Sequence, residues 1–412
     1  MSKPSFLNRN FVLLTQGQLV NQAGSQMALA ATAFWLKQVT NSATLVGLMS
    51  ALAALPLLLL GPLGGACADR LSRRNILIAC DLLCGMVSAV VAMLLYGQPG
   101  HVSYDALGLF LGTVILSSAI AFTSPALNAL IPSLVVKADV GAAMAFSQAS
   151  GFLALIVGQL LGGVLLTRYL PAVLFWVNAG SYFVSALAEL FVRTDARVIL
   201  APHEQRPGIF HDIREGFSYV WHRRGMRVLL LAAIPLNVLT TPVIVFLPFY
   251  TTNSLGQPLA RYGYLLAALS VGLLTGYAIS GRLPPQQHRR HAALFGCVGG
   301  CAAIIVALAF LQTFWRVALL IGLLGALIGI VTLISLNAFI QQTEPNKRGR
   351  VGAVLLMTTQ GITPIAMFAI GMLSDAMGNN IRVLYGACGM LLAATVVATS
   401  TNRDLRDFLQ HD

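Results

Sequence analysis

Long apolar runs separated by short polar segments dominate the 412-residue sequence. A helix needs about 20 mostly apolar residues to cross a lipid bilayer. Runs of that length predict an all-α integral membrane protein with twelve transmembrane helices. The predicted helices cover residues 10–36, 43–66, 75–97, 104–128, 141–167, 171–192, 227–252, 260–282, 291–312, 314–338, 351–376 and 381–400.

The longest polar stretch, Arg193 to Arg227, divides the predicted helices into six plus six. We therefore expect an N-terminal six-helix bundle over 1–195, a cytoplasmic linker over 196–226 and a C-terminal six-helix bundle over 227–412. In the linker, apolar side chains from Ile209 to Trp221 fall on one helical face. That pattern predicts an amphipathic helix lying at the membrane surface.

The two predicted bundles also look like repeats of each other. A shift of 216 residues places Gly65 on Gly281, and Arg73-Arg74 on Arg289-Arg290. Matches between apolar helices are common by chance, but matched glycines and arginine pairs at loop ends are not. We therefore expect two pseudo-symmetric bundles, as in many transporters.

Composition and charge support a membrane location. Only 10% of the residues are charged and 57% are hydrophobic, whereas soluble domains carry roughly 25% charged residues. The net charge is +12, and most of the charged residues lie between the apolar runs. We therefore expect the protein to have the lipid bilayer as its partner and not to bind nucleic acid. With both termini in the cytoplasm, 21 of the 26 Lys and Arg residues fall on the cytoplasmic side. This bias predicts a multi-pass protein of the bacterial inner membrane.

A conspicuous motif lies between the second and third predicted helices. It runs from Gly65 to Arg74, with Asp69, Arg70 and Arg73 at fixed places. We expect the glycine to allow close helix approach, the aspartate to bind the N-terminus of another helix, and the arginines to stay at the cytoplasmic surface. The motif resembles the signature loop of the major facilitator superfamily, G-x-x-x-D-R-x-G-R-R, with Ser72 in place of the usual glycine.

A glycine motif in the fifth predicted helix resembles the antiporter signature of the same superfamily. It comprises Gly158, Gly162 and Gly163, with Gln159 where that signature has proline. Small residues allow close packing of helices. Generic helix packing, without antiport, is the alternative interpretation.

Two further stretches resemble the branch that contains macrolide exporters and the enterobactin exporter. One runs from Asn41 to Asp81, and the other from Arg348 to Pro364. The resemblance implies a monomeric secondary transporter that exports amphipathic small molecules, such as macrolides or a siderophore, by alternating access and with proton coupling. A siderophore importer or a lysolipid flippase of the same fold is the alternative, because alternating access can run either way.

Polar positions inside the predicted helices indicate where a substrate binds. A polar side chain that faces lipid is costly, so it is expected to face a cavity or another helix. Helices 1 and 7 line the central cavity in this superfamily, and a weaker polar group occurs in helix 11. The expected cavity residues are Gln18, Asn21, Gln22, Ser25, Asn237, Thr241 and Gln360. Hydrogen bonding between helices is the alternative role for this stripe.

Ionisable residues within the predicted spans are few. Asp81 lies seven residues after Arg74, below the expected membrane surface, and is the candidate for proton coupling. Its alternative role is a buried partner of the arginine cluster. Glu189 and Asp375 lie near the ends of their helices.

Other functional classes are disfavoured. All seven histidines fall in loops or at the ends of predicted spans, and the six cysteines form no C-x-x-C pair, so we expect no metal site, no cofactor and no enzymatic activity. A channel would need a repeated filter or a ring of charge. No G-x-x-x-x-G-K-[S/T] sequence occurs, which excludes ATP-driven transport by this chain.

Overall fold

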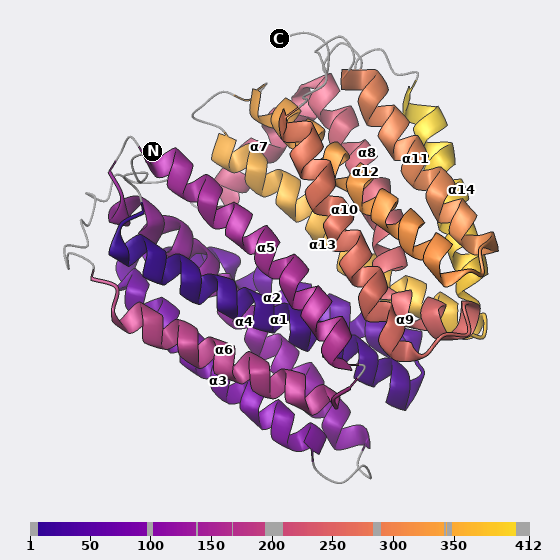
Figure 1. The fold of residues 1–412 in the computed structure, drawn as a ribbon. Helices are drawn as coiled ribbons and strands as arrows, with labels where there is room; N and C mark the ends of the chain where they lie inside the picture. Colours follow the sequence, from indigo (N-terminus) through magenta and orange to yellow (C-terminus); the bar gives the residue numbers. More distant parts are fainter. Residues whose placement is uncertain are drawn as a thin grey trace. The chain divides into compact units, whose positions relative to one another are not determined.

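The computed structural model describes residues 7–96, 102–136, 139–166, 168–193, 209–282, 290–341, 343 and 348–400. These residues form helices and short connections, with no strand among them (Figure 1). Contacts divide the chain into two compact units. The first comprises Met1–Asn41 and Leu52–Gln205, and the second comprises Ser42–Ala51 and Arg206–Asp412.

Six long helices form the first unit. The first turns of one of them, α2, belong to the second unit. In this unit α1 packs against α5 and α6, and α3 packs against α4 and α6. Phe11, Leu14, Leu77 and Ile131 are buried together where these helices meet. The helices are α1 (Arg9–Thr40), α2 (Ala43–Arg70), α3 (Arg73–Tyr96), α4 (Val102–Leu134), α5 (Val140–Leu166) and α6 (Pro171–Leu190).

The second unit contains the remaining helices, with α10 packed along α12 and α11 packed along α14. Glycines make the first of these contacts close. A Cβ added at Gly272 would lie 1.9 Å from the carbonyl oxygen of Gly322, and one at Gly276 would lie 2.1 Å from that of Ala326. The helices are α7 (Ile209–His222), α8 (Arg224–Val245), α9 (Leu247–Phe249), α10 (Tyr262–Arg282), α11 (Arg290–Phe310), α12 (Phe314–Gln341), α13 (Arg348–Ala376) and α14 (Ile381–Ser400), with a π-helical turn at Tyr250–Ser254 and a 3₁₀ turn at Leu259–Arg261.

Every range predicted to cross the membrane overlaps a long helix, although the range 227–252 runs past the end of α8 into α9 and the π-helical turn. Among the described residues, ten helices are long and apolar enough to span a bilayer. Helices α1 and α13 complete the predicted twelve but are not among those ten. Helix α1 carries a run of polar side chains that lowers its hydropathy, and in α13 the apolar helix found is Gly361–Ala376. The all-α membrane architecture is therefore confirmed, and twelve crossings remain a prediction.

The beginning of α2 packs on the end of α13 within the second unit. Glycines on both helices make the approach possible: a Cβ at Gly47 would lie 2.4 Å from the carbonyl oxygen of Met367, and one at Gly371 would lie 2.6 Å from that of Ala43. The carboxylate of Asp375 accepts hydrogen bonds from the first backbone N–H groups of α2. Helix α2 therefore begins among residues of the second unit and continues into the first.

The predicted linker helix is present as α7. Val220 is buried with Met226 and Leu230 of α8 in one apolar cluster, whereas Phe217 and Trp221 are exposed and stack with ring centroids 5.4 Å apart. Helix α7 is thus held to the second unit by one apolar side while aromatic rings stay uncovered. Exposed aromatic rings of this kind favour the membrane interface, where we predicted this helix to lie.

Candidate functional site

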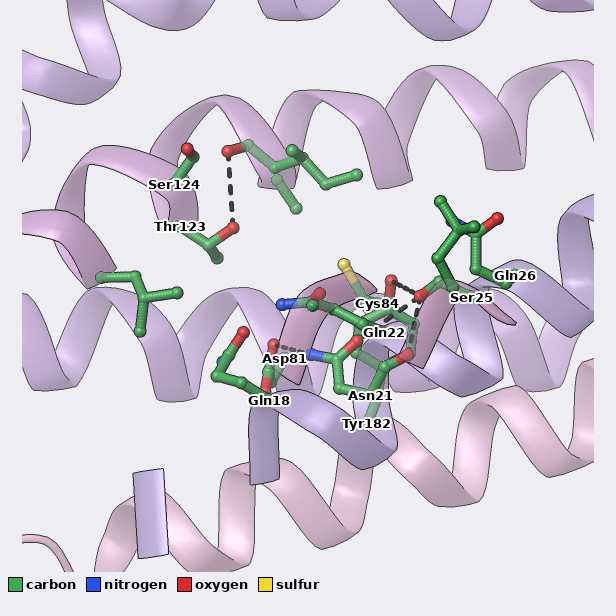
Figure 2. Close-up of a pocket in the computed structure, with 15 residues that line it drawn as sticks. Gln18, Asn21, Gln22, Ser25, Gln26, Asp81, Cys84, Thr123, Ser124 and Tyr182 are labelled. Atoms are coloured by element: carbon green, nitrogen blue, oxygen red, sulfur yellow. Dashed lines mark hydrogen bonds between the residues drawn. The ribbon is translucent and has the colours of Figure 1, made fainter. Parts of the chain in front are cut away.

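A cavity of about 310 Å³ lies inside the first unit (Figure 2). Its walls come from α1, α3, α4, α5 and α6. Helix α1 contributes amide and hydroxyl groups, whereas α4 and α5 contribute apolar side chains together with the hydroxyl groups of Thr123 and Ser124. The lining residues are Gln18, Asn21, Gln22, Ser25, Gln26, Asp81, Cys84, Ala119, Ile120, Thr123, Ser124, Leu127, Gly151, Leu155 and Tyr182.

Helix α1 presents its polar stripe because residues three or four apart share one face of a helix. Its other faces carry small residues that let α6 come close. A Cβ at Gly17 would lie 3.2 Å from the Oγ atom of Ser185, and one at Gly24 would lie 2.2 Å from the Oγ atom of Ser181. The backbone of α1 is thereby held against α6, which fixes the direction in which the stripe points.

The glycine motif of α5 holds the opposite side of α1. A Cβ at Gly158 would lie 2.4 Å from the carbonyl oxygen of Ala23, and one at Gly162 would lie 3.1 Å from the Cα atom of Met27. Gly163, the next residue, is buried. The first two glycines therefore lie at a tight contact between α1 and α5, on the same face of α5 as the cavity-lining Gly151 and Leu155.

Hydrogen bonds connect the α1 stripe to α3 and α6. The Asn21 amide donates to Asp81 Oδ1 at 3.0 Å, and the Gln18 amide donates to Glu189 Oε1 at 3.0 Å. The hydroxyl groups of Ser25 and Tyr182 are also 3.0 Å apart (Figure 2). The predicted residues Gln18, Asn21 and Ser25 thus both line the cavity and bind side chains of other helices, so the two interpretations of the stripe are compatible.

Asp81 lies at the wall of the cavity and only 1% of its surface is exposed. Among the described residues its bonded partner is an amide of α1, not an arginine. Arg73 donates to the carbonyl oxygens of Ala68 and Ala129. Arg74 donates to the carbonyl oxygens of Glu189 and Leu190. The arginines thus bind backbone carbonyls at the helix ends.

The structure separates two neighbouring glycines of the signature motif. A Cβ at Gly65 would meet no atom of the described residues within 4 Å, whereas one at Gly64 would lie 2.0 Å from the carbonyl oxygen of Ala121. The close helix approach that we expected at Gly65 therefore occurs at Gly64, between α2 and α4. Arg70 is exposed, and the side chain of Asp69 lies outside the described part of the structure.

The candidate residues of α8 bond to the backbone of their own helix. The Asn237 amide donates to the carbonyl oxygen of Ala233 at 2.9 Å, and the Thr241 hydroxyl donates to that of Asn237 at 2.7 Å. A small cavity of about 40 Å³ in this unit is lined mainly by apolar residues of α8, α11, α12 and α14, and neither residue is among those lining it. The side chain of Gln360 lies outside the described residues.

Sequence reasoning missed a second polar stripe, on α6. Its members are buried and spaced by three or four residues, the pattern already recognised on α1. They are Asn178, Ser181, Tyr182, Ser185 and Glu189. The spacing alone could have indicated that α6 faces the polar side of α1.

Comparison with known proteins agrees with this architecture. Residues 4–408 match the family described as transmembrane secretion effectors. The multidrug efflux pump Tap of Mycobacterium tuberculosis is 25% identical over 399 residues, covering 94% of this chain and 91% of that protein. Macrolide efflux protein A of Streptococcus pyogenes is 22% identical over 385 residues, covering 92% of this chain and 93% of that protein.

Solved structures show the same fold. The crystal structure of a D-xylose–proton symporter superposes with a TM-score of 0.75 and 16% sequence identity, covering 95% of this chain and 97% of that one. The helices, the cavity and these similarities define a multi-pass membrane transporter of small molecules rather than an enzyme. The chain belongs to the transmembrane secretion effector family, within the major facilitator superfamily.

Proposed function

We propose that this protein exports amphipathic drugs, such as macrolides, across the bacterial inner membrane, with both termini in the cytoplasm. The cavity of the first unit carries the proposal, because its lining combines amide and hydroxyl groups with apolar side chains. The efflux pumps similar to this chain support the direction of transport and the class of substrate.

The lining of the cavity favours large, weakly charged ligands. Ligand pockets are mostly apolar, with a few polar groups that fix the orientation of the ligand. Gln22 and Gln26 offer amides, Ile120 and Leu155 offer apolar surface, and Asp81 is the acidic residue among the lining residues. A small metabolite with several charges would find too few opposite charges there, whereas an amphipathic molecule would bury its apolar part.

Transport proceeds by alternating access of the two six-helix bundles, as in other secondary transporters. We propose that protons drive it, that Asp81 takes part in coupling, and that the protein acts as a monomer. A siderophore is a second possible substrate, because the sequence resembles the branch that contains the enterobactin exporter. A siderophore importer or lysolipid flippase is the alternative to export.

A transport assay tests this function. In inside-out vesicles with an imposed pH gradient, a fluorescent macrolide or dye should accumulate inside, and collapsing the gradient should abolish accumulation. Gln22→Ala should weaken substrate affinity several-fold, because a lining amide is lost. Val20→Ala is the matched control, since Val20 is 40% exposed on the opposite face of the same helix. Accumulation only in right-side-out vesicles would establish import instead.

A further inference from the structure

We propose that the first unit contains a buried binding site for one monovalent cation, a proton or Na⁺, formed by the carboxyl groups of Asp81 and Glu189 and the hydroxyl group of Ser185. The inference deepens the proposed function, because it supplies the site at which a cation gradient acts on export. Glu189 and Ser185 enter this site from α6, and Asp81 enters it from α3.

All three side chains are buried, and each has an oxygen atom without a partner. Asp81 and Glu189 are 1% exposed and Ser185 is 0% exposed. One carboxyl oxygen of each acid accepts an amide hydrogen bond from α1, as described above. The other oxygens, Asp81 Oδ2 and Glu189 Oε2, and the Oγ atom of Ser185 have no hydrogen-bond partner within the described residues.

These unpaired atoms lie near one another. The Ser185 hydroxyl lies beside the Asp81 carboxyl without forming a hydrogen bond of ordinary geometry. The two carboxyl groups are close enough for their charges to interact. Gly17 of α1 covers Ser185, since a Cβ there would lie 3.2 Å from its Oγ atom. Buried oxygen atoms that lack partners are rare in proteins because their desolvation is uncompensated, so this arrangement points to an additional bound group.

Charge determines which group fits. Arg74 is the cation beside Glu189, and its guanidinium is bonded to backbone carbonyls. The other titratable neighbours of Asp81 are Cys80, Cys84 and Tyr182, which add no positive charge. Helix α1 contributes only the neutral amides of Gln18 and Asn21. Two carboxylates beside one arginine leave one negative charge, which one monovalent cation neutralises.

A divalent metal fits this site less well. Ca²⁺ takes about six to eight oxygen ligands, and Mg²⁺ demands near-octahedral geometry. The described residues contain no group of three or more His, Cys, Asp or Glu side chains that could hold a metal ion. A proton needs only one carboxyl oxygen, and Na⁺ accepts carboxylate and hydroxyl oxygens together.

The cation site and the substrate cavity share side chains. Gln18, Asn21 and Asp81 line the cavity, and the two amides also bind the acids of the cation site. A substrate that takes a hydrogen bond from either amide changes the environment of both carboxyl groups. Binding at one site is then linked to binding at the other, by the same factor in both directions.

Binding measurements on purified protein without substrate test the inference. Infrared difference spectra recorded over a pH titration should show a buried carboxylic acid that loses its proton in the wild type. The signal should be absent from the Asp81→Asn/Glu189→Gln variant and intact in Asp105→Asn, a matched acid of α4 outside the site. If Na⁺ is the ligand, adding Na⁺ but not choline should shift the titration toward lower pH, and Ser185→Ala should weaken that shift at least tenfold.

Asp81→Asn and Glu189→Gln each replace an acid by the amide that resembles its protonated form, so both single variants should remain folded. Thermal melting of each variant tests this. A carboxyl signal that persists in the double variant would overturn the inference, and so would a wild type with neither a titrating acid nor a Na⁺ effect. Because no substrate is present, these outcomes are independent of export. Failure of export in vesicles with an intact titration would refute the proposed function and leave the cation site in place.

Discussion

The carboxylate of Asp375 accepts a hydrogen bond of 2.7 Å from the hydroxyl group of Ser42, although 333 residues separate the two in sequence. It also accepts bonds of 2.8 and 2.9 Å from the backbone N–H groups of Ala43 and Thr44. These are the free N–H groups at the beginning of α2, where a negative charge is stabilised by the helix dipole. Asp375 therefore caps α2 from the last turn of α13.

Removing this cap should destabilise the beginning of α2. Asp375→Asn keeps the shape of the side chain but loses the charge, and should cost about 0.5–1 kcal/mol. Asp375→Ala should cost more because the hydrogen bonds are lost as well. Thermal melting in detergent measures both. Melting temperatures equal to that of the wild type in both variants would contradict the capping role.

The signature motif predicts a matching interaction at the other ends of the same two helices. We expect Asp69, in the last turn of α2, to bind the N-terminus of α13 near Gly349 when the transporter opens outward. Asp69→Asn should therefore shift the population toward the inward-open state and slow transport. Accessibility of cysteines placed on the cytoplasmic side reports the shift. Unchanged transport together with unchanged accessibility would rule out this role of Asp69.

A variant that lacks both Asp69 and Asp375 offers a sharper comparison. If the caps at the two ends of α2 and α13 act in opposite conformational states, Asp69→Asn and Asp375→Asn should change cytoplasmic accessibility in opposite directions. The Asp69→Asn/Asp375→Asn variant should then fall between them. A double variant whose accessibility change exceeds that of both single variants in the same direction would show that the two caps do not oppose each other.

Cysteine substitution tests which polar residues meet water or substrate. In a background without the six native cysteines, cysteines at Gln18, Gln22 and Ser25 should react with a small polar thiol reagent, because these positions line the cavity. Substrate should slow the reaction. Val20→Cys, exposed on the face of α1 opposite the stripe, is the control that substrate should not protect. Unreactive cysteines at all three positions would reduce the stripe to helix packing.

The two neighbouring glycines of the signature motif provide a matched pair. Gly64→Ala should destabilise the protein by about 1–3 kcal/mol, because the new methyl group would overlap the carbonyl oxygen of Ala121. Gly65→Ala should have little effect, since a Cβ there meets nothing within 4 Å in the described part of the chain. Expression yield and thermal melting of the two variants measure this difference in stability. Equal loss in both would mean that Gly65 is also needed for packing.

The helices could be predicted from sequence because a bilayer imposes a minimum apolar length on each of them. The stripe on α1 could also be predicted, since Gln18, Gln22 and Ser25 share one helical face. The partners of the stripe could not. Whether Gln18 meets Glu189 or another residue depends on how α6 is rotated about its own axis, and hydropathy carries little information about rotation. The same limit explains why the close approach was assigned to Gly65 and lies at Gly64.

The contact between Ser42 and Asp375 also constrains the order of events during synthesis. Chain elongation proceeds at about 5–20 residues per second, so roughly 15–70 seconds pass between translation of Ser42 and translation of its partner. Throughout that time the first turn of α2 lacks the carboxylate that caps it and the glycine surface on which it packs. A nascent chain stopped before Asp375 would leave that turn uncovered, where membrane proteases and chaperones could recognise it as unfinished.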